Sequence, residues 1–351
     1  MPRATTATIH IDALRHNLAQ VRLLAPGSKV MAVVKADAYG HGLERVARAL
    51  AGADAFGVAA LTEAERLRAS GLSQRIVLLS GFDEVADLPQ LRRLGVDTVV
   101  HHESQLAMLE ADHEAEPINV WLKFDTGMHR LGFAPERVAQ VHARLSSLAN
   151  VAGDITLMAH FASSDEFGGK QTLAQLDSFA RSTAALTGPA SLSNSAAVLG
   201  WPDAHRDWVR AGGALYGLSV VEGKTGADFG LKPAMTLSTR LISINRVAKG
   251  ERIGYSATWE CPEDMDVGVA AIGYGDGYPR RAPAGTPVLV NGVCVPVIGR
   301  VSMDLITIDV GNALDLSEGD WVDIEYDLQN AAHTSGLSQY ELLTGLGHRF
   351  T

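Results

Sequence analysis

Between Lys29 and Gly217, short apolar segments alternate with stretches of helical periodicity, a pattern typical of repeated βα units around a parallel sheet. Eight is the number of strands in a closed (β/α)8 barrel, so we expect a TIM barrel, with an open doubly wound sheet as the alternative. The segments that fit buried strands are 29–34, 55–59, 75–79, 98–100, 119–124, 155–159, 191–193 and 208–210.

After Gly217, helical periodicity fades and alternating strands with tight turns take over. The dipeptide Asn291-Gly292 favours the positive φ angles of a two-residue hairpin turn between strands 288–290 and 293–295. We therefore expect an α/β plus all-β chain, joined through the Gly-rich segment 221–233. The barrel is assigned to residues 1–228 and a C-terminal β-strand domain to residues 229–351. Its further strands are predicted at 235–244, 267–272, 305–310 and 321–325.

The charge, cysteine content and hydrophobicity of the chain limit the kinds of molecule that it can bind and where we expect it to be found. The 351 residues exceed the usual size of a single core and carry a net charge of −10 without a run of Lys or Arg, which argues against nucleic acid or an anionic membrane as a partner. Cys261 and Cys294 are too few for a disulfide framework, and the N-terminus has no apolar signal core. No apolar run is long enough to span a bilayer. We expect a cytoplasmic protein that acts on a small molecule or pairs with a second copy.

Lys35 follows an apolar, β-branched strand and precedes small residues in the segment AVVKADAYGHG. Burial against an apolar wall lowers the pKa of an ammonium group, which is how a lysine becomes a nucleophile for Schiff-base chemistry. The alternative is a lysine that extends from the strand end into water.

The ends of five predicted barrel strands carry polar groups, and catalytic residues of such barrels gather at this rim. The loops after strands seven and eight read SNSAA and RAGGA, and such loops often hold phosphate through backbone N–H groups. Ser195 could equally be a helix cap, and Gly212 and Gly213 turn formers. A lysine opposite a phosphate site indicates pyridoxal 5′-phosphate. The rim residues are Lys35, Tyr39, Lys123, Asp125, Arg130, His160, Asn194, Ser195, Arg210, Gly212 and Gly213.

Eight motifs, in order along nearly the whole chain, resemble those of the alanine racemase family. They are AVVKADAYGHG, FDTGMHRLGF, MAHFASSDE, SNSAA, VRAGGALYG, RIGYSATW, IGYGDGYPR and GRVSMDL. The resemblance implies a pyridoxal-phosphate isomerase that interconverts L- and D-alanine, built as a homodimer with active sites shared between subunits. It does not separate supply of D-alanine for peptidoglycan from alanine catabolism.

The resemblance also implies roles for the reacting groups. Lys35 resembles the lysine that binds the cofactor and acts as one base, and Tyr255 resembles the second base, contributed by the neighbouring subunit. Two bases on opposite faces of Cα allow racemisation without rotation of a planar carbanion. Arg210 matches the arginine at the pyridine nitrogen, which it keeps unprotonated because arginine holds its own proton. His160 matches the residue that orients this arginine.

Further positions follow from the same resemblance. Arg130 matches the arginine near the cofactor's phenolic oxygen and the substrate carboxylate, and Lys123 matches a lysine that is carbamylated in many members. Met303 resembles the residue whose backbone N–H binds the substrate carboxylate, Asp304 lies in the same corridor, and Tyr278 resembles a gate residue at the channel mouth. Ala211 and Gly213 stand where many relatives carry Pro and Ile. The phosphate-binding positions are Tyr39, Ser195, Gly212, Gly213 and Tyr340, and Asn194 is also assigned to the cofactor.

The residues are also compatible with three alternative functions. A bulky Tyr340 favours alanine modestly over a serine-type or broader-specificity racemase. A non-catalytic pyridoxal-phosphate carrier is a second alternative. A metallohydrolase is a third, using carbamylated Lys123 with His101, His102 and His160, but the first strand offers Lys35 where such sites need a pair of histidines. We expect no metal.

Overall fold

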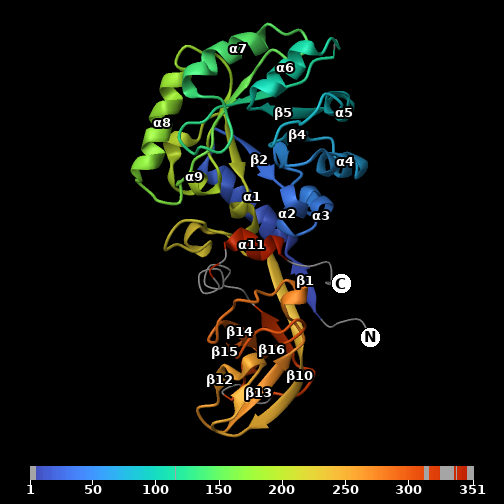
Figure 1. The fold of residues 1–351 in the computed structure, drawn as a ribbon, viewed down its shortest axis with the longest axis vertical. Coiled ribbons are helices and arrows are strands. Elements are labelled where there is room, and N and C mark those ends of the chain that lie inside the picture. Colours follow the sequence, from blue (N-terminus) through green and yellow to red (C-terminus); the bar gives the residue numbers. More distant parts are fainter. Residues whose placement is uncertain (1–4, 115, 312–315, 325–335, 337, 346–351) are drawn as a thin grey trace. The chain divides into compact units, whose positions relative to one another are not determined.

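The structure is a computed structural model, and it describes residues 5–114, 116–311, 316–324, 336 and 338–345. The chain divides into two compact units (Figure 1). One is Ile11–Lys232, and the other combines Met1–His10 with Pro233–Thr351. The division after Lys232 lies a few residues beyond the expected junction at 228. The first ten residues belong to the second unit, although the sequence analysis grouped them with the barrel.

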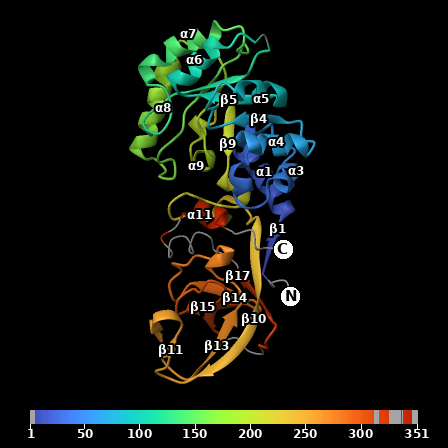
Figure 2. The same ribbon diagram turned by 45° about the vertical axis from the view of Figure 1, so that its right-hand side comes forward.

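The first unit is a closed barrel of eight parallel strands, which confirms the predicted TIM barrel (Figures 1 and 2). The barrel closes where β2 pairs with β9, with Val30 opposite Val209. Its strands are β2 (Lys29–Val33), β3 (Ala55–Val58), β4 (Arg75–Leu78), β5 (Val96–Val100), β6 (Val120–Lys123), β7 (Thr156–Met158), β8 (Ala190–Ser191) and β9 (Trp208–Ala211).

Helices alternate with the strands of this unit, and the longer ones bury apolar residues along one face. They are α1 (Ile11–Leu24), α2 (Lys35–Tyr39), α3 (Leu43–Ala49), α4 (Leu61–Ala69), α5 (Asp87–Leu94), α6 (Glu103–Ala111), α7 (Val138–Ser146), α8 (Lys170–Thr183) and α9 (Ser195–Gly200). Short 3-10 turns are η1 (Pro135–Arg137), η2 (Pro202–Ala204), η3 (Gly213–Tyr216) and η4 (Ala227–Phe229). Within the described residues, no helix is long and apolar enough to cross a membrane.

The end of the barrel where the strands begin is filled by a buried cluster that includes Trp121 and Trp208, whose rings lie 5.4 Å apart. Asp97 is buried there and accepts hydrogen bonds from Trp121 Nε1 at 2.9 Å and Arg75 Nε at 2.5 Å. Burial raises the pKa of this carboxyl group, against the opposing effect of Arg75 and Trp121. This packed end leaves the opposite rim, where the strands end, for binding and chemistry.

The second unit is built on an antiparallel seven-stranded sheet in the order β1-β10-β13-β16-β15-β14-β17. The predicted hairpin is confirmed: Asn291 and Gly292 have φ of 50° and 79°, and β14 pairs with β15. The strands are β1 (Thr6–Ile9), β10 (Met235–Val247), β13 (Met265–Ala270), β14 (Pro287–Val290), β15 (Val293–Ile298), β16 (Ile306–Asp309) and β17 (Trp321–Ile324). Smaller elements are β11 (Arg252–Ile253), β12 (Trp259–Glu260), η5 (Tyr255–Ala257), η6 (Tyr274–Asp276) and α11 (Gln339–Thr344).

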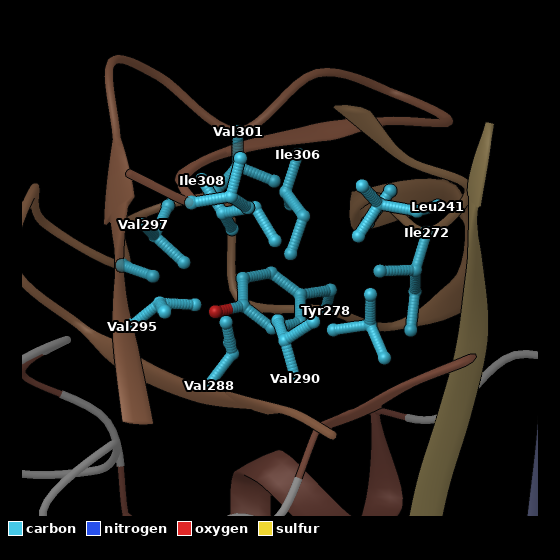
Figure 3. Packing of buried hydrophobic residues seen from close by; sticks show 14 of the residues in the cluster. Leu241, Ile272, Tyr278, Val288, Val290, Val295, Val297, Val301, Ile306 and Ile308 are labelled. Atoms are coloured by element: carbon cyan, nitrogen blue, oxygen red, sulfur yellow. The ribbon is translucent and has the colours of Figure 1, made fainter. Parts of the chain in front are cut away.

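The core of the second unit consists mainly of branched aliphatic side chains that alternate along its strands (Figure 3). Val288 and Val290 point into it from β14, and Ile306 and Ile308 from β16. The ring of Tyr278 lies among them. Tyr278 and Ile272, on either side of η6, belong to this core, so burial anchors the segment that carries this turn.

Candidate active site

Lys35 lies where β2 ends, at the start of a left-handed helical turn. The four residues after it, Ala36 to Tyr39, have φ between 52° and 55°, although none is glycine. Two hydrogen bonds close the turn, from Ala38 N to Val34 O at 2.9 Å and from Gly40 N to Ala36 O at 3.1 Å. This conformation costs about 1–2 kcal/mol for each such residue. Contacts with the surrounding barrel must therefore hold the turn. These tertiary contacts, and not the intrinsic backbone preferences of the residues in the turn, determine where Lys35 lies.

Side chains on both sides of the turn stabilise it. Asp37 Oδ1 accepts hydrogen bonds from Leu43 N at 3.1 Å and from Arg66 Nη2 at 2.9 Å. On the inner side, the ring of Tyr39 lies 4.8 Å from that of Tyr216, centroid to centroid. Tyr216 is fully buried and donates its hydroxyl hydrogen to Val33 O at 3.1 Å. The base of the turn is thereby tied to η3, which follows the last barrel strand.

The environment of Lys35 favours a neutral amine. Burial lowers the pKa of this side chain, the positive charge of Arg130 lowers it further, and Glu63 opposes the change. A lysine with a lowered pKa has a larger fraction of nucleophilic amine at neutral pH. The structure thus supports the amine chemistry that the strand-end position suggests.

Lys123 ends β6 and lies in the same electrostatic environment. Its side chain is only 5% exposed, and burial together with the nearby cations Arg210 and Arg130 lowers its pKa to about 8. The loop that carries Arg130 is fixed at both ends, because Phe133 N donates to Lys123 O at 3.1 Å and Asp125 N donates to Phe133 O at 2.9 Å. These contacts keep the guanidinium-bearing loop beside the end of β6.

Arg210, on β9, is the most completely enclosed cation of the rim. Its guanidinium donates to Ser191 Oγ at 2.7 Å, Ala159 O at 2.8 Å and Leu192 O at 3.0 Å, and Nη2 lies 3.2 Å from His160 Nδ1. Burial lowers the pKa of Arg210 to about 9, so it remains protonated at neutral pH. Burial, followed by Arg210 and the other cations, keeps the pKa of His160 well below its ordinary value. The imidazole is therefore neutral and can accept the hydrogen bond.

Ser195 connects the two loops that the sequence analysis assigned to phosphate. Its Oγ accepts hydrogen bonds from Gly212 N at 2.8 Å and Ala214 N at 3.2 Å, which leaves its own hydrogen available to donate. Gly212 also permits a close approach, since a Cβ atom there would lie 2.8 Å from the hydroxyl oxygen of Tyr39. The structure thus brings together three of the predicted phosphate-binding residues, and Gly213 follows directly in η3.

Asn194 has a structural function in this arrangement. Its Oδ1 accepts the Ala197 N–H at 3.0 Å as the N-cap of α9, and it also accepts the hydroxyl of Ser164 at 2.8 Å. The cap predicted as an alternative role for Ser195 is formed one residue earlier, by Asn194. The oxygen of Asn194 is therefore committed to the helix start, and a cofactor contact would have to come from its amide nitrogen.

The predicted residues of the second unit include two large exposed side chains. Tyr255 is 71% exposed and Met303 is 52% exposed. Tyr274, which the sequence analysis did not select, is also exposed and adjoins Met303: Tyr274 N donates to Ser302 O at 3.0 Å, and Gly275 N donates to Met303 O at 2.8 Å. Because a Cβ atom at Gly273 would lie 2.3 Å from Ser302 O, glycine is required for this approach.

Tyr278 corrects one prediction. The ring was assigned to the mouth of an entry channel, but it is only 2% exposed and lies in the aliphatic core of the second unit (Figure 3). Burial also raises the pKa of its phenol group. A residue packed in this way cannot line a channel without disrupting the core. The motif IGYGDGYPR contains two tyrosines, and burial, which the sequence did not reveal, identifies Tyr274 as the one with access to solvent.

Tyr340 lies on α11 in the second unit, where it is half-buried. Asp304 is also half-buried, next to Met303. The structure positions both within their own unit, and their predicted contacts with phosphate and substrate stay predictions.

The histidines proposed for a metallohydrolase have other contacts. His101 Nε2 lies 2.9 Å from Ser80 O, and His102 Nδ1 accepts from Ser104 N at 3.2 Å at the start of α6. His160 is engaged with Arg210. Among the residues that the structure describes, no three His, Cys, Asp or Glu side chains are grouped so that they could hold one metal ion. The donor set argues against this alternative.

The rim suits a pyridoxal phosphate group by its chemistry. A lysine with a lowered pKa, a buried arginine, and a serine hydroxyl whose hydrogen is available to donate are groups that such a cofactor needs. Gly212 leaves the space beside the Tyr39 hydroxyl clear of a side chain. Lys35 and Tyr39 lie on α2, Ser195 begins α9, and Arg210 and Gly212 lie on and directly after β9, so the barrel itself assembles them.

Comparison with known proteins agrees with this geometry. Residues 9–220 match the alanine racemase N-terminal domain and residues 234–351 match the alanine racemase C-terminal domain. An alanine racemase of Shewanella denitrificans is 49% identical over 350 residues, covering 98% of this chain and 96% of the relative. The crystal structure of a biosynthetic alanine racemase from Pseudomonas aeruginosa is 43% identical, with a TM-score of 0.95 over 99% of this chain and 98% of that one.

A solved structure with lower sequence identity contains pyridoxal phosphate. It is an alanine racemase from Bartonella henselae with covalently bound pyridoxal phosphate, 26% identical, with a TM-score of 0.89 over 100% of this chain and 99% of that one. Both halves of the chain and the barrel rim therefore lead to the same conclusion: the chain belongs to the alanine racemase family.

Proposed function

We propose that this protein is an alanine racemase, an isomerase that interconverts L-alanine and D-alanine with pyridoxal 5′-phosphate as its cofactor. The observation that carries the proposal is the barrel rim, where Lys35 has a lowered pKa and Arg210 is buried and donates hydrogen bonds to Ser191, Ala159 and Leu192, in a chain with relatives named alanine racemase.

Several residues would hold the cofactor. Lys35 would bind it covalently, Arg210 would face the pyridine nitrogen, and Arg130 would face the phenolic oxygen. The phosphate would lie at the loops joined by Ser195, close to Gly212 and the hydroxyl of Tyr39. Because the N–H groups of Gly212 and Ala214 are donated to Ser195 Oγ, the hydroxyl hydrogen of Ser195 is a donor that these loops would offer to the phosphate.

When bound, the cofactor supplies an electron-withdrawing ring that makes the Cα proton of the substrate removable. Lys35 acts as the base on one face of Cα, and its lowered pKa keeps a usable fraction of amine at neutral pH. Arg210 keeps its own proton and donates a hydrogen bond, because its pKa of about 9 lies above neutral pH. It therefore does not protonate the pyridine nitrogen, which limits electron withdrawal and side reactions.

Tyr255 acts as the base on the opposite face and comes from a second copy of the chain. The support is its exposure of 71%, together with that of Met303 and Tyr274 on the same unit. A base that handles a Cα proton needs shelter from water, and a single copy of the second unit does not shelter this side chain. A homodimer with shared sites would cover it, and Met303 would offer its backbone N–H to the substrate carboxylate.

Lys123 is proposed to carry a carbamate. A pKa of about 8 leaves a fraction of neutral amine at pH 7, whose nitrogen can attack the carbon of carbon dioxide and release a proton. The product is an anion beside the cations Arg130 and Arg210. It would offset their repulsion and hold Arg130 in place.

The direct test is a chiral assay of purified protein supplied with pyridoxal phosphate and either enantiomer of alanine. Both reactions should proceed to the same mixture, and Lys35→Ala should abolish them. Lys170→Ala is the matched control, because Lys170 is an exposed lysine at the start of α8. Absence of racemisation by the loaded wild-type protein would refute the proposal.

The same assay addresses the alternatives. A panel of serine and larger amino acids distinguishes an alanine racemase from a serine-type or broader-specificity enzyme, and half-buried Tyr340 favours alanine only modestly. A pyridoxal-phosphate carrier without catalytic activity would retain cofactor and show no turnover in the wild-type protein. Loss of turnover with retained cofactor in Tyr255→Phe would count against that alternative.

A further inference from the structure

Glu63, the third residue of α4, links two loops at the rim of the barrel. Its Oε1 accepts the backbone N–H of Ala36 at 2.6 Å. Its Oε2 accepts the N–H groups of Ala59 at 2.8 Å and Ala60 at 3.3 Å. One carboxylate therefore joins the turn after β2 to the loop after β3.

Helix capping explains only half of this geometry. A glutamate at the third helical position commonly accepts a hydrogen bond from the residue before the helix, which Oε2 does here at Ala60. Oε1 instead reaches a residue 27 positions away, directly after Lys35. Ala36 is also the first of the left-handed residues, with φ of 53°. The contact thus fixes the point where the chain leaves the ordinary backbone conformation beside the lysine.

The charge of Glu63 acts on the same lysine. Arg130 lowers the pKa of Lys35 and Glu63 raises it. Lys123, at the end of β6, and Lys35 each count among the charges of the same rim, since the charge of Lys35 also lowers the pKa of Lys123. Of the two charges that shift the pKa of Lys35, the carboxylate of Glu63 therefore opposes the neighbouring guanidinium of Arg130.

The other side chains beside the turn have different partners. Arg66 pairs with Asp37 and Glu44, at 2.9 Å and 2.8 Å. These contacts hold the far side of the turn, at Asp37 and Leu43. The backbone N–H next to Lys35, that of Ala36, is instead bound by Glu63.

We propose that Glu63 is a positioning residue for Lys35: its carboxylate clamps the start of the left-handed turn and so sets the place of the lysine amine. The proposal rests on the proposed function, in which Lys35 binds the cofactor and moves a proton. Glu63 itself touches the backbone at Ala36, Ala59 and Ala60 and acts on the reaction through Lys35.

The test compares Glu63→Gln with Glu65→Gln in the full chain freed of cofactor. Glu65 lies on the same helix and pairs with Arg93 at 2.9 Å on the surface, so its variant removes the same charge away from the turn. Hydrogen exchange of peptides spanning residues 34–40 reports the clamp. Loss of a charge-assisted hydrogen bond should speed exchange at Ala36 by about tenfold in Glu63→Gln and leave Glu65→Gln unchanged.

The second measurement is the pH midpoint for acetylation of Lys35 by acetic anhydride, read by mass spectrometry of the peptide. Without the Glu63 carboxylate the midpoint should move to lower pH, because the negative charge favours the ammonium form. Glu63→Asp, which keeps the charge on a shorter side chain, should speed exchange with a smaller shift of the midpoint. This variant also serves if Glu63→Gln does not fold.

Unchanged exchange and an unchanged midpoint in Glu63→Gln and Glu63→Asp would overturn the proposal. Equal changes in Glu65→Gln would also overturn it, because they would indicate a general effect of charge on α4. Neither measurement requires cofactor or turnover. A failure of racemisation in the wild-type protein therefore refutes the proposed function separately from the role of Glu63.

Discussion

Arg210 Nη2 lies 3.2 Å from His160 Nδ1, and the imidazole at this position is neutral because burial and nearby cations keep its pKa well below the ordinary value. A protonated histidine could not accept the hydrogen bond and would add a positive charge beside a buried arginine. This pair fixes the guanidinium at the centre of the barrel rim.

Replacing His160 should affect the reaction more than the fold. In His160→Ala, Arg210 keeps three acceptors, so we expect the free energy of unfolding to fall by only about 1.5–3 kcal/mol, the value of one hydrogen bond to a charged group. The kcat for alanine should fall by about tenfold because the arginine is less well oriented. His160→Asn, which restores an acceptor, should recover part of the loss. An unchanged kcat in His160→Ala would show that the contact has no positioning role.

Lys123 should make stability depend on pH in a defined window. In buffer free of carbon dioxide, its pKa is about 8 in the folded chain and 10.5 ordinarily, so the folded state loses this proton first as pH rises. The unfolding free energy should therefore increase between pH 8 and 10.5, by roughly 3 kcal/mol for this buried group. The penalty is fully present below pH 8.

Lys123→Met removes this penalty. Urea unfolding at a series of pH values should show the variant more stable than the wild-type protein at pH 7, with the difference disappearing by about pH 10.5. Added bicarbonate should stabilise the wild-type protein and not the variant if the carbamate forms. A difference between the two proteins that is constant with pH would contradict the lowered pKa of Lys123.

Gly212→Ala should weaken the cofactor site. The added Cβ would lie 2.8 Å from the Tyr39 hydroxyl oxygen, so the tyrosine must move. We expect pyridoxal phosphate to bind at least about tenfold more weakly, as measured by titration of the cofactor-free protein. Gly27→Ala is the control, since no atom lies within 4 Å of a Cβ there and its φ is not in the left-handed region. Equal affinities in the two variants would contradict a phosphate site beside Tyr39.

Ser195→Ala should lower both stability and cofactor affinity. Its Oγ accepts two buried N–H groups, at Gly212 and Ala214, and leaving them unpaired should cost about 2–4 kcal/mol. Chemical denaturation of the cofactor-free protein measures this cost. Ser147→Ala, on an exposed position after α7, should change stability little. A variant as stable as the wild-type protein would show that water replaces the hydroxyl.

The architecture could be predicted from local patterns, because buried parallel strands and hairpin turns each have a short sequence signature. The predicted segment 29–34 corresponds to β2, and Asn291-Gly292 forms the turn between β14 and β15. The pairing of β1 with β10 could not be predicted in this way. Its partners, such as Thr6 and Ser238, are more than 200 residues apart, and four residues near the N-terminus carry no signal of where they pair.

The sequence predicts those residues of the candidate site that directly follow barrel strands. Lys35, Lys123, Ser195 and Arg210 gather at the rim because the barrel brings all strand ends to one side. The left-handed turn after Lys35 was not predictable, since Ala36 and its neighbours include no glycine, and tertiary contacts impose the conformation. The difference in burial between Tyr278 and Tyr274 was also not predictable, because the spacing of two tyrosines within one motif does not determine which ring enters the core.

The most direct test of the whole account is to mix two inactive variants, Lys35→Ala and Tyr255→Phe, under conditions that exchange subunits. If each active site combines Lys35 of one copy with Tyr255 of another, a mixed dimer has one intact site. Equal mixing should then recover about a quarter of the wild-type racemase activity, because about half of the dimers are mixed and each has one working site of two. Activity no greater than the sum of the two variants, in a mixture shown to contain mixed dimers, would contradict the shared two-base site.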